Sequence, residues 1–193
     1  MATPNPTRTR ILDATGQLLR DHGYAGTGLK AISTSAAAPF GSLYHHFPLG
    51  KEELAAAALR HAAAGYAERV SAVLVAAGDD PVEAMRVAFR RAADTLVATD
   101  WADACPIATV ALEVASSNEV LRSVAAEIFE GWLAGLDTYF VAAGIDPGTA
   151  RSLSTLFLAA LEGGFLLSRT ARDTGPMHVL GEAVASAVAS ARG

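Results

Sequence analysis

Apolar residues recur at helical spacing along almost the whole chain of 193 residues, from Thr7 onward. In the first segment, for example, Ile11, Ala14 and Leu18 lie on one face of a helix with 3.6 residues per turn. We find no run of β-branched residues that alternates with polar ones over the length of a strand. The periodicity therefore predicts an all-α fold.

Glycine, proline and hydroxyl residues divide the N-terminal part of the chain into short helices. The first is expected over 7–22 and ends at Gly23, because glycine readily adopts the left-handed conformation that follows a helix end. Thr27 is a good N-cap for a second helix through Ser35. Pro39 favours the start of a third helix, since proline at a first helical position loses no hydrogen bond. With the short alanine turn between the second and third segments, the pattern predicts a helix-turn-helix.

Longer helices are expected in the rest of the chain. An alanine-rich helix that begins at Lys51 reaches the mid-70s, and Gly78 and Pro81 mark its end and the start of the next helix. Further helices are expected over 81–99, 104–116, 118–143, 147–172 and 176–191. We predict a helix-turn-helix DNA-binding domain over 1–50 and a larger helical ligand-binding and dimerisation domain over 51–193. The long fourth helix joins them.

The third helix has one packing face and one free face. At about 100° per residue, Leu43 and Phe47 lie on one side. Gly41, Ser42 and His45 point away from them. A helix this short is unstable by itself because nucleation is costly, so neighbouring helices must hold it. The free face offers a small residue for close approach, a hydroxyl and a donor that reaches base edges, as reading of the major groove requires.

The segment from Gly41 to Leu54 reads GSLYHHFPLGKEEL. It resembles the recognition helix and the start of the fourth helix in the TetR family of transcription regulators, and Gly23, Tyr24, Thr27 and Ile32 are in register with the same family pattern. The resemblance implies binding to a double-stranded DNA operator, with Thr27 and Lys51 as phosphate contacts. The residues that we predict to bind DNA are Thr27, Lys30, Pro39, Phe40, Gly41, Ser42, Tyr44, His45 and Lys51.

Some residues of this region leave more than one interpretation open. Ala37 stands where the family usually has glycine, and Phe40 stands where it has a basic or polar residue. Phe40 lies about 40° from the packing stripe, so contact with the core and contact with a thymine methyl are equally open. Tyr44 lies between the two faces, where its ring can pack and its hydroxyl can donate to a phosphate. Taken alone, Tyr44, His45 and His46 are ordinary surface aromatics, and only the full pattern favours DNA binding.

The segment CPIATVALE, from Cys105 to Glu113, makes the chain similar to the TetR subgroup of lincomycin-resistance and flavonoid-responsive regulators. The similarity implies an inducer-binding second domain, and most of the large aromatic residues lie there. The residues that we predict to contact a small apolar or aromatic inducer are Phe89, Trp101, Cys105, Glu113, Phe129, Trp132, Phe157, Leu161 and Glu162. For any one of the aromatic residues, the simpler interpretation is that it fills the core. For Cys105, the simplest interpretation is a small apolar residue at a helix start. Glu113 and Glu162 fit a pocket, an interface or plain solvent exposure.

The composition favours self-association. Hydrophobic residues make up 51% of the chain and charged residues 18%, so an apolar face is expected to remain for a partner subunit or a ligand. The resemblance places dimerisation in the last two long helices. The residues that we predict at the interface of a homodimer are Gly163, Phe165, Leu166, Leu180, Val184 and Val188.

Net charge and cysteine content exclude several classes of protein. A net charge of −5 argues against a protein that coats nucleic acid over its whole surface. Cys105 is the only cysteine, which excludes an intrachain disulfide and an all-cysteine metal site, and no metal or cofactor is predicted. The first ten residues have no apolar signal core, and Glu162 and Glu182 interrupt the most apolar stretches. We therefore expect a cytoplasmic protein with no membrane span.

These patterns predict a ligand-responsive repressor that binds a near-palindromic operator as a dimer. The alternative is a helical small-molecule-binding protein or enzyme without DNA binding. We expect no enzymatic activity, because the five histidines show no catalytic spacing apart from the pair that faces DNA.

Overall fold

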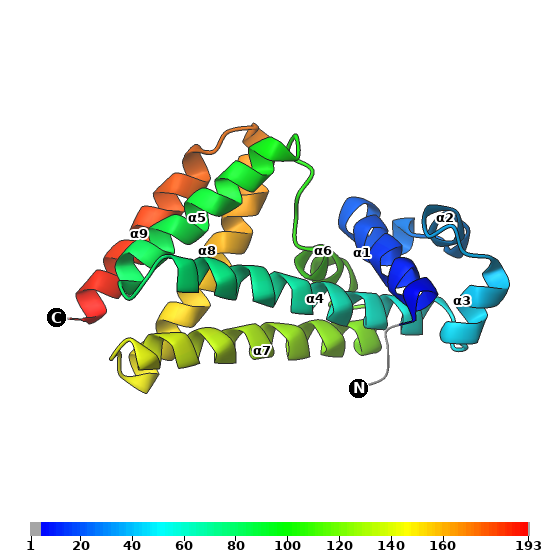
Figure 1. Cartoon of the computed structure of the whole chain (residues 1–193), viewed down its shortest axis with the longest axis horizontal. Helices are drawn as coiled ribbons and strands as arrows, with labels where there is room; N and C mark the ends of the chain where they lie inside the picture. The colour runs from blue at the N-terminus through cyan, green and yellow to red at the C-terminus, as the bar shows by residue number, and fades with distance from the viewer. Residues whose placement is uncertain (1–4, 193) are drawn as a thin grey trace. The chain divides into compact units, whose positions relative to one another are not determined.

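The computed structural model describes residues 5–192, and every regular element in that range is an α-helix (Figure 1). The nine helices of that range are α1 (Pro6–Gly26), α2 (Leu29–Ser35), α3 (Phe40–His46), α4 (Lys51–Ala76), α5 (Pro81–Ala98), α6 (Pro106–Val114), α7 (Glu119–Ala142), α8 (Pro147–Ala171) and α9 (Gly175–Ala191). The all-α prediction is confirmed. Each helix expected from the sequence is present, with ends that differ by a few residues.

The helices form two compact units. The first holds the described residues up to Tyr66 together with Ala104–Ile128, and the second holds Ala67–Asp103 and the residues from Phe129 onward. Both α4 and α7 contribute to each unit. This grouping differs from the division expected between residues 50 and 51. The difference arises because α6 packs against α1 and so belongs to the same unit as the helix-turn-helix (Figure 1).

Gly23 breaks α1 at the point where the sequence predicted its end. Its φ of +67° and ψ of −173° lie in a region that only glycine adopts without strain. One more helical turn follows, and the hydroxyl of Thr27 then donates a 2.7 Å hydrogen bond to the carbonyl oxygen of Gly23. The predicted end of the helix at Gly23 is therefore a kink within α1, which continues to Gly26.

The segment from α2 to α3 has the predicted helix-turn-helix pattern. In α2, Ile32 is buried, and Ala37 in the following turn adopts the left-handed conformation with φ of +46°. Pro39 then lies at the N-cap of α3, and the backbone N–H of Phe47 at its C-cap donates to the carbonyl oxygen of Leu43. Leu43 and Phe47 are both buried, which confirms the packing face. This burial holds a helix of seven residues that would not be stable alone.

The core of the second unit lies between α5, α8 and α9, which run side by side in Figure 1. Phe89 of α5 and Phe157 of α8 meet edge to face there, with ring centroids 5.6 Å apart. Two glycines permit close helix contacts. A Cβ atom at Gly181 would lie 2.7 Å from the Cβ of Phe89, and one at Gly164 would lie 2.7 Å from the Sδ of Met177. Larger residues at these positions would separate α9 from its neighbours.

Candidate functional site

The helix α3 presents a free face opposite Leu43 and Phe47. Gly41 and His45 are exposed and Ser42 is half-buried, so these three residues remain accessible. A Cβ atom at Gly41 would meet no other atom within 4 Å. The imidazole rings of His45 and His46 pack edge to face, 4.9 Å apart. The face therefore carries donors on a surface that is open to a groove of DNA.

Phe40 and Tyr44 flank this free face. Phe40 is 45% exposed, so of its two open interpretations the structure favours an accessible ring over a core residue. Tyr44 is 51% exposed, and the inner side of its ring lines a small apolar crevice with Leu29, Leu43 and Leu54. The ring is thus held by packing while its outer part stays accessible, as expected for a residue between two faces.

Cationic side chains surround the same region. The ammonium group of Lys51, at the start of α4, lies 4.2 Å from the centroid of the Tyr24 ring. The guanidinium group of Arg8 lies 5.4 Å from the centroid of the Phe47 ring. Lys30 is exposed on α2. Two of these cations are therefore held by aromatic rings and can still present charge to a phosphate.

The role that the resemblance implied for Thr27 is wrong for its side chain. Thr27 is 1% exposed, and its hydroxyl is engaged with the carbonyl of Gly23. The N-cap of α2 is Gly28, which makes no side-chain capping bond. The Thr27 side chain stabilises the kink after α1, and it is not available to a phosphate while that bond is made.

Glu113 joins α6 to the turn in α1. One carboxylate oxygen accepts a 2.6 Å hydrogen bond from the backbone N–H of Tyr24, and the other accepts a 2.7 Å bond from that of Ala25. A Cβ atom at Gly23 would lie 2.5 Å from the nearer oxygen. Glu113 therefore does not line a pocket as predicted, because both of its oxygens are used by a segment 88 residues away. Burial, with the charges of Glu52 and Glu113, raises the pKa of the Tyr24 phenol.

A second polar contact links the start of α4 to the start of α7. The side-chain amide of Asn118 donates a 2.7 Å hydrogen bond to the carboxylate of Glu52. The amide oxygen of Asn118 accepts from the backbone N–H of Leu121 and so caps α7. Neither residue has a functional signature in the sequence. Their pairing gave no signal in the sequence, because 66 residues separate them.

The aromatic residues predicted to bind an inducer have different surroundings. Phe89 and Phe157 are 1% and 2% exposed and belong to the apolar core of the second unit. Phe129 and Trp132, on neighbouring turns of α7, are half-buried and pack edge to face with centroids 5.8 Å apart. Phe89 and Phe157 are therefore core residues.

The remaining predicted ligand contacts, apart from Trp101, are buried or half-buried. Cys105 is buried at the N-cap of α6, where its sulfur accepts from the backbone N–H of Ala108 at 3.4 Å. This is the small residue at a helix start that the simpler interpretation expected. Leu161 and Glu162 are half-buried on α8.

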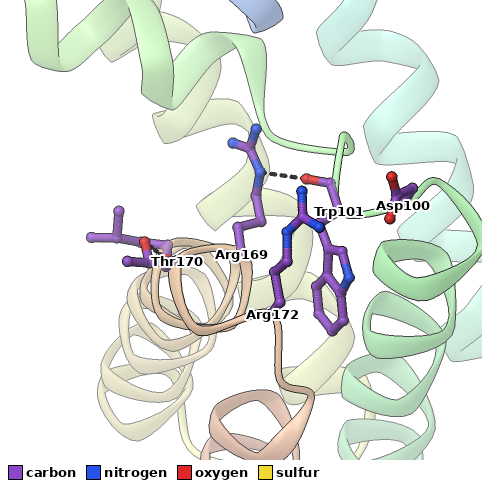
Figure 2. A pocket seen from close by; sticks show the side chains of 6 residues that line it. Asp100, Trp101, Arg169, Thr170 and Arg172 are labelled. Atoms are coloured by element: carbon purple, nitrogen blue, oxygen red, sulfur yellow. Dashed lines mark hydrogen bonds between the residues drawn. The ribbon is translucent and has the colours of Figure 1, made fainter.

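Trp101 lines an open pocket of about 320 Å³ between the end of α5 and the end of α8 (Figure 2). The pocket is lined by Asp100, Trp101, Leu166, Arg169, Thr170 and Arg172. The Nε of Arg169 donates a 2.9 Å hydrogen bond to the backbone oxygen of Trp101. The structure therefore places one of the predicted ligand-binding residues beside two arginines that the sequence analysis did not select.

The residues predicted at a dimer interface divide into buried and exposed groups. Val184 and Val188 are fully buried, and Phe165 is nearly so, all in the core of their own chain. The interface prediction is therefore wrong for these three, because α9 and α8 turn this face toward each other and toward α5. Leu180 is half-buried against the same core, Gly163 is half-buried, and Leu166 is exposed.

Other apolar side chains of α8 and α9 are exposed. Leu156 and Leu167 on α8 are 41% and 54% exposed, and Val179 on α9 is 69% exposed. Leu156, Gly163 and Leu167 recur at helical spacing, so they lie on one face of α8. The apolar surplus inferred from composition is thus partly on the surface of these two helices.

α8 is long and apolar enough to cross a membrane by length and composition alone. The core helix of a soluble protein has the same properties, and α8 packs against α9 and α5 through Leu153 and Phe157. One side of α8 therefore belongs to the core of the second unit. Over residues 5–192, no group of three or more histidine, cysteine, aspartate or glutamate side chains is placed to hold a metal ion.

Comparison with known families identifies two matching regions. Residues 11–58 match the model of bacterial regulatory proteins of the tetR family. Residues 81–183 match the model of the C-terminal domain of LmrA/YxaF-like transcriptional regulators. The first region contains α2, α3 and the start of α4, and the second extends from the start of α5 into α9.

Individual relatives agree with these matches. The uncharacterized HTH-type transcriptional regulator YxaF of Bacillus subtilis is 33% identical over 95% of this chain and 96% of its own length. The HTH-type transcriptional regulator LmrA of the same organism is 32% identical over 89% of this chain and 90% of its own. Among solved structures, a regulatory protein TetR from Rhodobacter sphaeroides has a TM-score of 0.82 and 19% identity, with 95% of this chain and 99% of that one covered. That last likeness shows the shared fold.

Proposed function

Because the chain belongs to the TetR family of transcription regulators, we propose that it is a repressor that binds a near-palindromic operator as a homodimer and is released by a small organic ligand. The observation that carries this proposal is the accessible face of α3. Gly41, Ser42 and His45 lie on the side opposite the buried Leu43 and Phe47. The families and relatives matched by the chain are regulators of transcription and not enzymes.

Base reading is assigned to α3, and phosphate contact to the cations around it. A seven-residue helix with a small residue at its start fits the major groove closely, and His45 reaches base edges. Lys30, Lys51 and the hydroxyl of Tyr44 set the register on the backbone of the duplex. Phe40, exposed beside them, is the contact for a thymine methyl.

A dimer follows from the geometry of operator reading. One α3 reads one half-site, and two copies related by a twofold axis read a near-palindrome. We assign the interface to the exposed apolar side chains of α8 and α9, Leu156, Leu167 and Val179, in place of the buried Val184 and Val188. A second copy of this chain buries the same surface on both partners, which an isologous interface requires.

The ligand is assigned to the second unit and is aromatic or apolar. A ligand releases DNA only when it prefers the conformation that does not bind DNA, so tight binding alone is insufficient. A tenfold loss of operator affinity requires a preference of about 1.4 kcal/mol. Two half-buried aromatic surfaces are available to supply this preference for one conformation. One is Trp101, and the other is the pair of Phe129 and Trp132 on α7.

The proposal is tested by selecting DNA that the purified protein retains from a random pool and measuring affinity for the selected sequence. His45→Ala and Tyr44→Ala are expected to weaken specific binding by about 1–3 kcal/mol per half-site, while helicity and dimerisation are unchanged. His22→Ala, an exposed histidine on α1, is the matched control. If the pool yields no preferred sequence, the reading function fails. If either α3 variant binds like the control at the same salt, the role of that residue fails.

A further inference from the structure

The pocket beside Trp101 has an unusual backbone for an open surface site. Asp100, Trp101 and Arg172 have φ values of +47°, +65° and +50°, in the left-handed region that favours glycine. They end α5 and α8, where glycine would close the helix without this cost. All three side chains line the pocket. The chain thus keeps an aspartate, a tryptophan and an arginine at positions where their side chains cost stability.

The charges of the pocket are unevenly paired. Neither Arg169 nor Arg172 forms an ion pair with another described residue, although Arg169 is held by its bond to the Trp101 carbonyl. Figure 2 shows the Arg172 side chain alongside the Trp101 indole, and the Arg169 side chain at the backbone oxygen of Trp101. Asp100 supplies one negative charge at the wall. Two cations and one anion leave a local positive charge beside an aromatic ring.

We propose that this pocket binds a planar aromatic carboxylate. The guanidinium groups of Arg169 and Arg172 hold the carboxylate, because a planar guanidinium matches the two oxygens of that group. The ring of the ligand packs on the Trp101 indole and the Leu166 side chain. The proposal deepens the ligand response proposed above by naming the class of ligand, and it rests on that function only for its biological role.

The size and the wall of the pocket define the ligand further. About 320 Å³ is at the lower end of small-molecule sites and suits one or two fused rings. Asp100 repels a second negative charge, so a monoanion is preferred over a phosphate dianion. The Thr170 hydroxyl donates to the Leu166 carbonyl and keeps a lone pair for a donor on the ligand.

Calorimetric titration of the full chain tests the binding step without DNA. The probes are 2-naphthoate, its neutral counterpart 2-naphthalenemethanol, and inorganic phosphate. We expect 2-naphthoate to bind at least about tenfold more tightly than either of the others, since each lacks one of the two matched features. Equal binding of the neutral compound, equal binding of phosphate, or no binding of 2-naphthoate overturns the proposal.

Arg172→Gly is a variant in which stability and binding are expected to move in opposite directions. Glycine relieves the left-handed backbone, so the melting temperature stays the same or rises, while loss of the guanidinium weakens 2-naphthoate binding by about tenfold or more. Arg172→Lys keeps the charge and is expected to retain part of the affinity. Arg90→Ala, an exposed arginine of α5 outside the pocket, is the control. If Arg172→Gly binds 2-naphthoate like this control, the assigned carboxylate contact is wrong.

The DNA function is measured separately, so that the two proposals fail separately. Operator affinity is compared with and without saturating 2-naphthoate. If the protein binds 2-naphthoate as expected but never binds a preferred DNA sequence, the proposed function fails and the pocket assignment stands. If it binds operator but not 2-naphthoate, the pocket assignment fails and the proposed function stands.

Discussion

The contact between Glu113 and the turn in α1 gives the sharpest prediction about stability. The carboxylate accepts hydrogen bonds of 2.6 and 2.7 Å from two consecutive backbone amides, and both bonds join α6 to the segment before α2. Glu113→Ala removes both acceptors at once. We expect the first unit to lose stability and α2 and α3 to lose a fixed support.

The size of the expected loss in stability follows from the type of hydrogen bond that is removed. Hydrogen bonds to a charged group contribute about 1.5–3 kcal/mol each when buried. Tyr24 is half-buried and Ala25 exposed, so water replaces part of the lost interaction, and we expect a total of about 1–3 kcal/mol. For a chain of this length that corresponds to a fall in melting temperature of roughly 2–12 °C. Glu113→Gln is expected to be nearly as damaging, because its amide nitrogen would face a second donor.

Substitution of Gly23 tests whether the contact is direct. Gly23→Ala introduces a Cβ atom 2.5 Å from a Glu113 oxygen and also strains a backbone with φ of +67°. The backbone strain alone costs about 1–3 kcal/mol and is present in any background. The clash is present only when Glu113 is there. Gly23→Ala is therefore expected to cost about 1–3 kcal/mol less in the Glu113→Ala background than in the natural chain.

Denaturant unfolding of the four proteins in this cycle, followed by circular dichroism, measures these differences. The control is Glu127→Ala, whose exposed pair with Arg60 should contribute less than about 1 kcal/mol. Operator affinity of the Glu113→Ala protein, measured below its unfolding transition, shows whether the support also affects DNA binding. If Glu113→Ala unfolds at the same midpoint as the control, or if Gly23→Ala costs the same in both backgrounds, the contact between Glu113 and the turn does not stabilise the fold.

Four further substitutions each test a single position. Lys51→Ala is expected to weaken binding to all DNA sequences and to reduce the salt slope of binding by about one, and an unchanged slope excludes a phosphate contact. Ala37→Gly is expected to raise stability by up to about 1 kcal/mol in thermal unfolding, because the residue already has φ of +46°; destabilisation contradicts this. Val184→Glu is expected to unfold the chain, since Val184 is 0% exposed, whereas Leu167→Glu is expected to give folded monomers in sedimentation. A folded Val184→Glu protein or a dimeric Leu167→Glu protein refutes the corresponding assignment.

Local features of the sequence were sufficient for the helices and for the faces of the third one. Helical spacing, the glycine at position 23 and the proline at 39 each act within a few residues. The structure has a kink at Gly23, where the helix was expected to end, and α3 begins directly after Pro39. The packing role of Leu43 and Phe47 follows from the angle of 100° per residue and is confirmed. The expected function came from the resemblance to the TetR family, because the geometry of one helix does not indicate what it binds.

Contacts between distant segments were beyond the reach of the same reasoning. Thr27 has the residue type of a helix cap, but its neighbours bury it and its hydroxyl bonds backward to Gly23. Val184 and Val188 form the apolar column that the sequence predicts, and only the packing of α9 against α5 and α8 shows that the column faces inward. Periodicity gives a face and not the partner of that face, because a helix has the same pattern whether its own chain or a second copy covers it.

The two sites with the most specific chemistry depended entirely on tertiary structure. Glu113 looked like a solitary carboxylate on an apolar helix, and its partners are backbone amides, which every residue possesses and no sequence distinguishes. Trp101 and Arg172 are separated by some seventy residues and meet because α5 and α8 end at the same place. The sequence determines which faces and ends each helix offers, and the packing of the helices decides which of them meet.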